Sequence, residues 1–261
     1  MKKVALCYTG GKDSTLTLHL LLDKVTKIEY KDYLNFSHDF TKTLDLNSEF
    51  IFTTLVTFHP KDPSFLSHPL PLLKDIGKSL NLNHKFIEIS GPNYLESYAE
   101  AIKSLNVDVL VTGDMMNVCN NFMFNATEKA GIKIFCPLWD CDRKKIWDLV
   151  LDHYKLSVFI TCINLSKFQF LPEEKEVKDK DERNELNLIK SYIGKKFDWI
   201  FFETLQRCSE KYNVDLCGEN GEFHSMCLNG PLFQYEIKLP QINSLKIDKT
   251  GTYCYLDVPI I

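Results

Sequence analysis

The chain has 261 residues, of which 44% are hydrophobic and 25% are charged. This is the ordinary mix of a globular protein and excludes a wholly disordered or collagen-like chain. The net charge of -4, with no block of Lys and Arg, argues against a nucleic-acid-binding arm. The nine cysteines are odd in number and include no CxxC pair, which favours buried reduced thiols over a disulfide scaffold. We find no signal peptide and no apolar run long enough for a membrane span, so we expect a cytoplasmic protein.

Strands and helices alternate along the first two thirds of the chain. An apolar run at residues 4–8 ends at a glycine pair and predicts a buried strand, and a helix is expected from Asp13 or Ser14 to about Asp23. Further strands are expected at residues 51–58, 85–89, 107–113, 132–136 and 157–163, and further helices at 71–82, 93–105, 118–130 and 142–154. Because the two types alternate, the fold class is α/β, with a Rossmann-like parallel sheet and right-handed crossovers.

The last third of the chain has a different pattern. A charged stretch at 172–187 separates it from the rest, and a helix is expected at 197–213. After Gly218 the pattern favours strands at 232–239, 245–247 and 253–258. We therefore expect an ATP-binding domain at 1–165, a charged linker or insertion at 166–189 and a smaller α+β acceptor-binding domain at 190–261. Residues 24–49 are an insertion of uncertain structure.

The strongest motif is a glycine-containing loop between the first strand and the first helix. It reads Thr9-Gly10-Gly11-Lys12-Asp13-Ser14. Glycines let the backbone approach a ligand closely, and the free N–H groups at a helix start favour an anion. Lys12 adds positive charge, and two hydroxyl groups add donors. These features suit a polyphosphate, while a glycine-rich surface turn is the plain alternative.

The loop lacks the GxxxxGK[ST] spacing of a Walker A motif. It resembles the S-G-G-K-D-S PP-loop of the ATP pyrophosphatase superfamily, with Thr9 in place of the first serine. The resemblance implies an adenine nucleotide alpha hydrolase-like fold, ATP and Mg²⁺ as cofactors, and cleavage of ATP to AMP and pyrophosphate. Asp13 has two candidate roles, as a helix cap or as a contact to nucleotide or magnesium.

A second motif lies near the C-terminus. Residues 217–224 read C-G-E-N-G-E-F-H, and residues 229–233 read N-G-P-L-F. Together with V-T-G-D at 111–114 and C-P-L-W at 136–139, they resemble the diphthine–ammonia ligase family. The resemblance implies an ATP-dependent ligase that amidates diphthine on elongation factor 2. Its nitrogen source would be ammonium, and its products diphthamide, AMP and pyrophosphate.

The resemblance also implies site residues. The ATP-binding residues would be Thr9, Gly10, Gly11, Lys12, Asp13, Ser14, Gly113 and Asp114, and the catalytic residues Lys12, Asp13, Glu219 and Glu222. From their spacing in a glycine-broken loop, both glutamates can face one cavity, where carboxylates plus Phe223 or Trp139 would hold a cation. The alternative is that both glutamates cap local turns. No metal ligands can be named.

Histidines form a second group of candidates. His224 is a candidate general base, and His59 and His68 are candidates for the cleft mouth. His19, among leucines of the first helix, is expected in the core.

One departure from the family leaves the acceptor open. The family's acidic E-G-D-E-V-E-D-L segment is replaced here by residues 90–98, which keep one acid, Glu96. Two other functions therefore stay open: a tRNA-modifying or otherwise adenylating PP-loop enzyme, and an ATP-binding sensor without turnover. A homo-oligomer is equally left open.

Overall fold

The first sheet is parallel and has five strands. The computed structural model describes residues 1–22, 30–61, 67–117, 119–169, 180–239, 245–248 and 250–256. The strands are β1 (Lys2–Cys7), β2 (Phe50–Pro60), β3 (His84–Ile89), β4 (Val109–Val111) and β5 (Lys133–Phe135). Their order is β3-β2-β1-β4-β5, and every neighbouring pair is parallel. The predicted α/β class with a Rossmann-like parallel sheet is confirmed.

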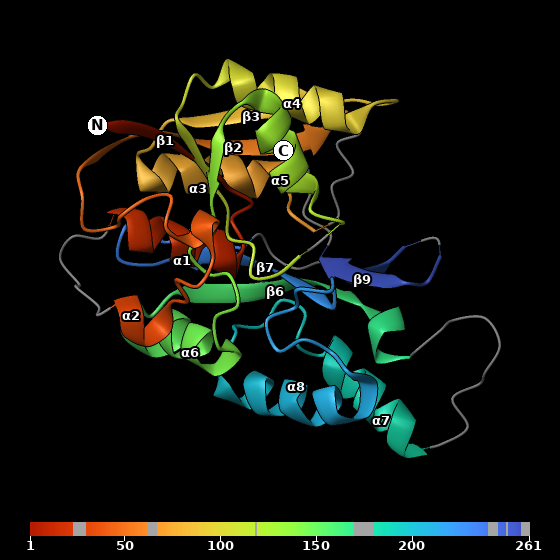
Figure 1. Cartoon of the computed structure of the whole chain (residues 1–261). Coiled ribbons are helices and arrows are strands. Elements are labelled where there is room, and N and C mark those ends of the chain that lie inside the picture. The colour runs from red at the N-terminus through yellow and green to blue at the C-terminus, as the bar shows by residue number, and fades with distance from the viewer. Residues whose placement is uncertain are drawn as a thin grey trace.

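Helices cover both faces of this sheet (Figure 1). One face packs against α4 (Tyr94–Ser104) and α5 (Phe122–Ala130), and the other against α1 (Lys12–Leu22) and α3 (Leu70–Leu80). Side chains of β1 alternate accordingly: Ala5 joins the α4–α5 core, whereas Val4 and Leu6 join the core around α1. Of the expected 24–49 insertion, the described part contains the short helix α2 (Tyr30–Tyr33) and a 3₁₀ turn at Asp39–Thr41.

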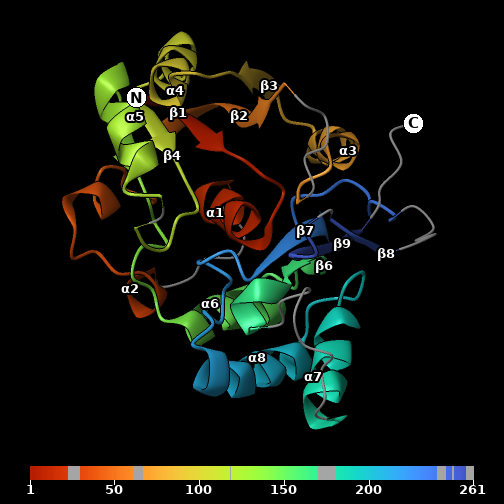
Figure 2. The same ribbon diagram turned by 90° about the vertical axis from the view of Figure 1, so that its right-hand side faces the viewer.

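A second, smaller sheet lies on the far side of α1 (Figures 1 and 2). It contains β6 (Ser157–Asn164), β7 (Phe223–Asn229), β8 (Leu245–Ile247) and β9 (Tyr253–Leu256), in the order β7-β6-β9-β8. All its pairs are antiparallel. The prediction that residues 157–163 continue the parallel sheet is wrong, because this strand pairs with two strands from the end of the chain.

Two further predictions in this region need correction. Strand β7 was not expected, and residues 232–239 form no strand. Their backbone donors are bound elsewhere: Gln234 N–H donates to Ser79 O at 2.8 Å and Ile237 N–H to Leu228 O at 2.8 Å. These bonds hold the segment against α3 and β7 instead of in a ladder. Strands at 245–247 and 253–256 are confirmed, and residues 257–258 of the second prediction lie outside the described part.

The outer face of the second sheet is covered by helices (Figure 2). These are α6 (Arg143–Asp148), continued by a π-helical turn at Leu149–His153, then α7 (Lys180–Lys190) and α8 (Trp199–Tyr212), and a 3₁₀ turn at Leu165–Phe168 follows β6. Of the expected linker at 166–189, residues 170–179 lie outside the described part. None of the helices described is both long and apolar enough to span a membrane.

Trp147 on α6 lies at the centre of the core between the second sheet and these helices. Its side chain is fully buried, stacks on Phe197 at a centroid distance of 3.6 Å, and donates its indole N–H to Leu216 O at 3.0 Å. The bond ties α6 to the segment that leads into the second motif.

We expect Trp147→Ala to lower the free energy of unfolding by about 3–5 kcal/mol, since it removes a large buried ring and orphans a carbonyl. Urea unfolding measures the change. Ile200→Ala on α8 is the control, because Ile200 is 66% exposed; its effect should stay within about 0.5 kcal/mol. Equal losses in the two variants would contradict this packing.

Candidate active site

The glycine loop after β1 is shaped by one left-handed residue. Gly10 has φ +72°, and a Cβ there would lie 2.8 Å from Leu73 and 3.0 Å from Met226. Within the loop, Ser14 Oγ donates to Gly11 O at 3.2 Å and lies 3.3 Å from Thr9 Oγ1. The loop thus turns sharply into α1 with its hydroxyl groups gathered on one side.

Strand β7 of the second sheet is hydrogen-bonded to the glycine loop. Cys227 N–H donates to Gly10 O at 2.7 Å, and Lys12 N–H donates to Ser225 Oγ at 3.2 Å. Strand β7, more than 200 residues further along the chain, therefore contacts the turn that carries the predicted phosphate-binding residues.

Lys12 and Asp13 form an ion pair at the start of α1. Lys12 Nζ lies 2.7 Å from each carboxylate oxygen of Asp13, and the lysine side chain is only 2% exposed. Burial by itself lowers the pKa of Lys12, but the carboxylate of Asp13 outweighs burial and raises it above its usual value. Lys12 is therefore a permanent positive charge inside the site.

The end of β4 approaches the loop closely. A Cβ on Gly113 would lie 2.9 Å from the backbone of Asp13 and Ser14, so a glycine is required there. The next residue, Asp114, accepts a hydrogen bond from Thr112 Oγ1 at 2.9 Å. Burial, followed by the charge of Asp13, raises the pKa of Asp114.

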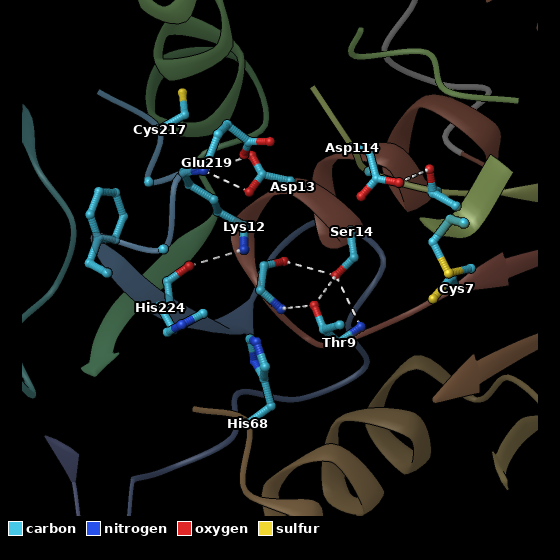
Figure 3. A pocket seen from close by; sticks show the side chains of 18 residues that line it. Cys7, Thr9, Lys12, Asp13, Ser14, His68, Asp114, Cys217, Glu219 and His224 are labelled. Atoms are coloured by element: carbon cyan, nitrogen blue, oxygen red, sulfur yellow. Dashed lines mark hydrogen bonds and ion pairs between the residues drawn. The ribbon is translucent and has the colours of Figure 1, made fainter. Parts of the chain in front are cut away.

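The segment before β7 closes the site from the other side. Glu219 Oε2 accepts a hydrogen bond from Met115 N–H at 3.2 Å, which joins the second motif to the end of β4. Its loop is held by Asp215, which accepts from Cys217 N–H at 2.7 Å and pairs with Arg143 at 2.9 Å. The carboxylate of Glu219 thereby lies beside Lys12 and Asp13 (Figure 3).

Glu222 has a different position. It is 1% exposed, and its carboxylate accepts N–H groups of Asp215 at 2.7 Å and Asn220 at 2.9 Å. It does not line the pocket. The expectation that both glutamates face one cavity is therefore met by Glu219 and not by Glu222, whose carboxylate holds the loop together.

A pocket of about 300 Å³ collects the remaining candidates (Figure 3). Of the predicted residues it brings together Thr9, Gly11, Lys12, Asp13, Ser14, Gly113, Asp114 and Glu219, while Gly10 contributes the turn behind them. Sequence reasoning missed Cys7, Thr112 and Ser225, which reach the pocket through strand ends or strand pairing, and Met123, which reaches it from α5. His68 and His224 also line it, as do Cys217 and Phe223.

Three carboxyl groups and one ammonium group share this pocket. Burial, followed by the charge of Asp13, raises the pKa of Glu219 to about 8, although Lys12 acts in the opposite direction. At neutral pH such a carboxyl is protonated in most of the protein molecules, whereas an ordinary carboxyl is ionised. The pocket thus holds a carboxyl group poised to exchange a proton.

Asp13 and Asp114 are suited to a divalent cation. They line the same pocket, and the charge of Asp13 contributes to the raised pKa of Asp114. A Mg²⁺ ion would relieve that repulsion, and one or two carboxylates plus phosphate oxygens are its common ligands. In the described ranges, no group of three or more His, Cys, Asp or Glu side chains has metal-site geometry.

The cysteines and aromatic residues of the two motifs separate into different environments. Burial, followed by the charge of Asp114, raises the pKa of the Cys7 thiol to about 12, and burial also raises that of Cys217. Neither thiol is activated as a thiolate. Phe223 lines the pocket, with Lys12 Nζ 5.8 Å from its ring centre, whereas Trp139 packs outside it against Phe40 and Phe124.

Residues 183–258 match the family described as diphthamide synthase C-terminal domain. The resemblance to the diphthine–ammonia ligase family is confirmed there. No curated protein matches the chain. The solved structure of a predicted subunit of a tRNA methyltransferase from Methanocaldococcus jannaschii is 12% identical and has a TM-score of 0.40. That match covers 91% of this chain and 100% of the other, and so low a TM-score carries no argument about function.

The raised pKa of Glu219 predicts a pH-dependent stability. A carboxyl whose pKa rises from 4.5 to about 8 on folding stabilises the fold fully below 4.5, and this contribution is lost as the pH rises through 8. Glu219→Gln should therefore gain stability relative to the wild type between pH 5 and pH 8.5, by about 1 kcal/mol or more. Chemical denaturation at a series of pH values measures this, with exposed Glu128→Gln as the control. A difference between Glu219→Gln and the wild type that stays constant with pH would contradict the assignment.

Glu222→Gln tests whether this carboxylate holds the loop before β7 together. It replaces an acceptor by an amide that faces backbone N–H groups, so we expect a loss of about 1–3 kcal/mol in unfolding free energy. Thermal unfolding measures the change, and Glu203→Gln on the exposed side of α8 is the control. An unfolding midpoint equal to that of the wild type would show that the carboxylate does not hold the loop.

Proposed function

We propose that the chain is an ATP-dependent amide ligase that converts diphthine on elongation factor 2 to diphthamide. ATP would be cleaved to AMP and pyrophosphate, and ammonium would supply the nitrogen. The observation that carries the proposal is one pocket in which the PP-loop residues and the second motif meet. The bond from Met115 to Glu219 joins the second motif to the end of β4 in the same pocket. The match at 183–258 supports the same reaction class.

The proposed nucleotide side is formed by the loop and the end of β4. Thr9, Gly10, Gly11, Lys12 and Ser14, with Gly113, would bind the phosphates, and Asp13 and Asp114 would hold Mg²⁺. When bound, the metal ion supplies positive charge against the phosphate oxygens. Lys12 would stabilise the charge that develops on the departing pyrophosphate, because it is buried and permanently protonated.

The proposed acceptor side is formed by the second motif. A carboxylate oxygen of the acceptor attacks the α-phosphorus, and ammonia then displaces AMP from the acyl adenylate. The ionised form of Glu219 would take the proton that ammonium must lose, since a carboxylate whose conjugate acid has a pKa of about 8 is a stronger base than an ordinary one. Glu222 is assigned a positioning role through the loop that presents Glu219.

We retain the division of roles along the chain as part of this proposal, although β6 at the end of the first segment pairs with the strands of the second. Residues 1–165 would bind ATP and residues 190–261 would receive the acceptor, in the cytoplasm where elongation factor 2 works. The protonated state of the pocket thiols counts against sulfur transfer, the chemistry of one group of tRNA-modifying relatives.

The test uses ATP labelled at the α-phosphate, with Mg²⁺, ammonium and elongation factor 2 that carries diphthine. We expect AMP and pyrophosphate to form in the same amount as diphthamide, which is measured by mass spectrometry. Lys12→Met should reduce the rate by about 10²–10³-fold. Lys78→Met is the control, because Lys78 is exposed on α3 and outside the pocket. Formation of ADP, or full activity in Lys12→Met, would overturn the proposal.

A further inference from the structure

Two histidines form one wall of the pocket. His68 precedes α3 and His224 belongs to β7, yet their ring centres lie 5.4 Å apart at an interplanar angle of 81°. Both line the pocket. His68 lies against the glycine loop, with its Cε1 3.7 Å from the position that a Cβ on Gly11 would take.

The pair and the carboxylates lie on different sides of Lys12. Figure 3 shows Asp13 and Glu219 at the end of the lysine side chain, and His68 and His224 near its backbone. The backbone of Gly11, in the loop whose N–H groups favour an anion, is on the side of the imidazoles. An anion bound at Gly11 would contact the histidine wall.

Both imidazoles are neutral without a ligand. Burial, followed by the charge of Lys12, lowers the pKa of His224 to about 4. Burial, followed by His224, lowers the pKa of His68 to about 3. The other titratable groups that face the pocket are Lys12 and Asp13 of α1, Cys7 of β1, Asp114 after β4, and Cys217 and Glu219 before β7. A polyphosphate would reverse the local field, because its negative charges exceed the single positive charge of Lys12.

We infer that the His68–His224 pair takes up a proton when the pyrophosphate part of ATP binds and donates it to pyrophosphate as that group leaves. The inference rests on the proposed function and names the proton donor for its first step. As the acceptor oxygen attacks the α-phosphorus, the bond from that phosphorus to the bridging oxygen breaks. The electron pair stays on the pyrophosphate oxygen, which receives the imidazolium proton, and the imidazole is neutral again. The proton enters from solvent with ATP and leaves with pyrophosphate.

The first measurement uses the wild-type protein and inorganic pyrophosphate. Histidine Cε1–H resonances followed by NMR give the pKa of each imidazole with and without the anion. We expect at least one histidine that titrates below pH 5 in the free protein to titrate above pH 6 in the complex. Histidine titrations that pyrophosphate leaves unchanged would overturn the inference.

The second measurement compares variants. Titration calorimetry in buffers of different ionisation enthalpy gives the number of protons taken up with pyrophosphate. We expect His68→Gln/His224→Gln to take up about one proton fewer than the wild type at pH 6.5. His84→Gln is the matched control: its imidazole also has a pKa lowered to about 4, mainly by burial, but it lies outside the pocket. Equal uptake in the wild type and the double variant would overturn the inference.

A rate measurement separates a chemical role from a structural one. In the pyrophosphate-release assay, the kcat of the double variant should fall by about 10²-fold. It should also no longer change with pH near the pKa of the histidine pair. A kcat and pH profile equal to those of the wild type would overturn the inference.

The outcomes separate this inference from the proposed function. If pyrophosphate binds without a change at the histidines, the inference fails and the ligase proposal stands. If pyrophosphate does not bind the wild type, the inference fails, and so does the proposed binding of phosphates by the glycine loop. If AMP and pyrophosphate form together with the proton uptake but no diphthamide appears, only the ligase proposal fails. If ATP yields ADP, no pyrophosphate leaves and both fail.

Discussion

The contact between the glycine loop and β7 is the constraint on which the site depends. A loop with φ +72° at Gly10 is held by hydrogen bonds from Cys227 to its carbonyl and from Lys12 to Ser225. Both bonds join the loop to β7 of the second sheet, so the first sheet alone does not define the loop. The same strand carries Phe223 and His224 into the pocket, so one element sets both the loop and the wall opposite it.

Charge is distributed unevenly across this pocket. Lys12 is a buried cation that Asp13 compensates, and the surplus of acid falls on Asp114 and Glu219, whose pKa values rise mainly through burial. Burial of these ionisable groups costs free energy. Under the proposed function, a ligand with phosphates and a metal ion would offset part of that cost.

Local patterns in the sequence predict much of this structure. The strand–helix alternation predicts the parallel sheet, and the glycine pair after residues 4–8 predicts the turn into α1, because both depend on neighbouring residues. The place of β6 was mispredicted, since its partners lie about 60 and 90 residues further along the chain and periodicity carries no information on pairing. Spacing likewise could not distinguish Glu219 from Glu222. Only the folded loop shows that Glu222 is enclosed by N–H groups of its own loop, whereas Glu219 lines the pocket. His68 was placed correctly at the cleft, but its contact with His224 arises only from tertiary packing.

The position of strand β6 limits where the chain can be divided into fragments. It is flanked by β7 and β9, yet it precedes the region 183–258 that matches the family of C-terminal domains. A fragment cut at that boundary would leave two strands with unpaired ladder groups facing each other across a missing neighbour. The region matched by sequence similarity is therefore smaller than the sheet to which its strands belong. A fragment that keeps the second sheet intact must begin before β6.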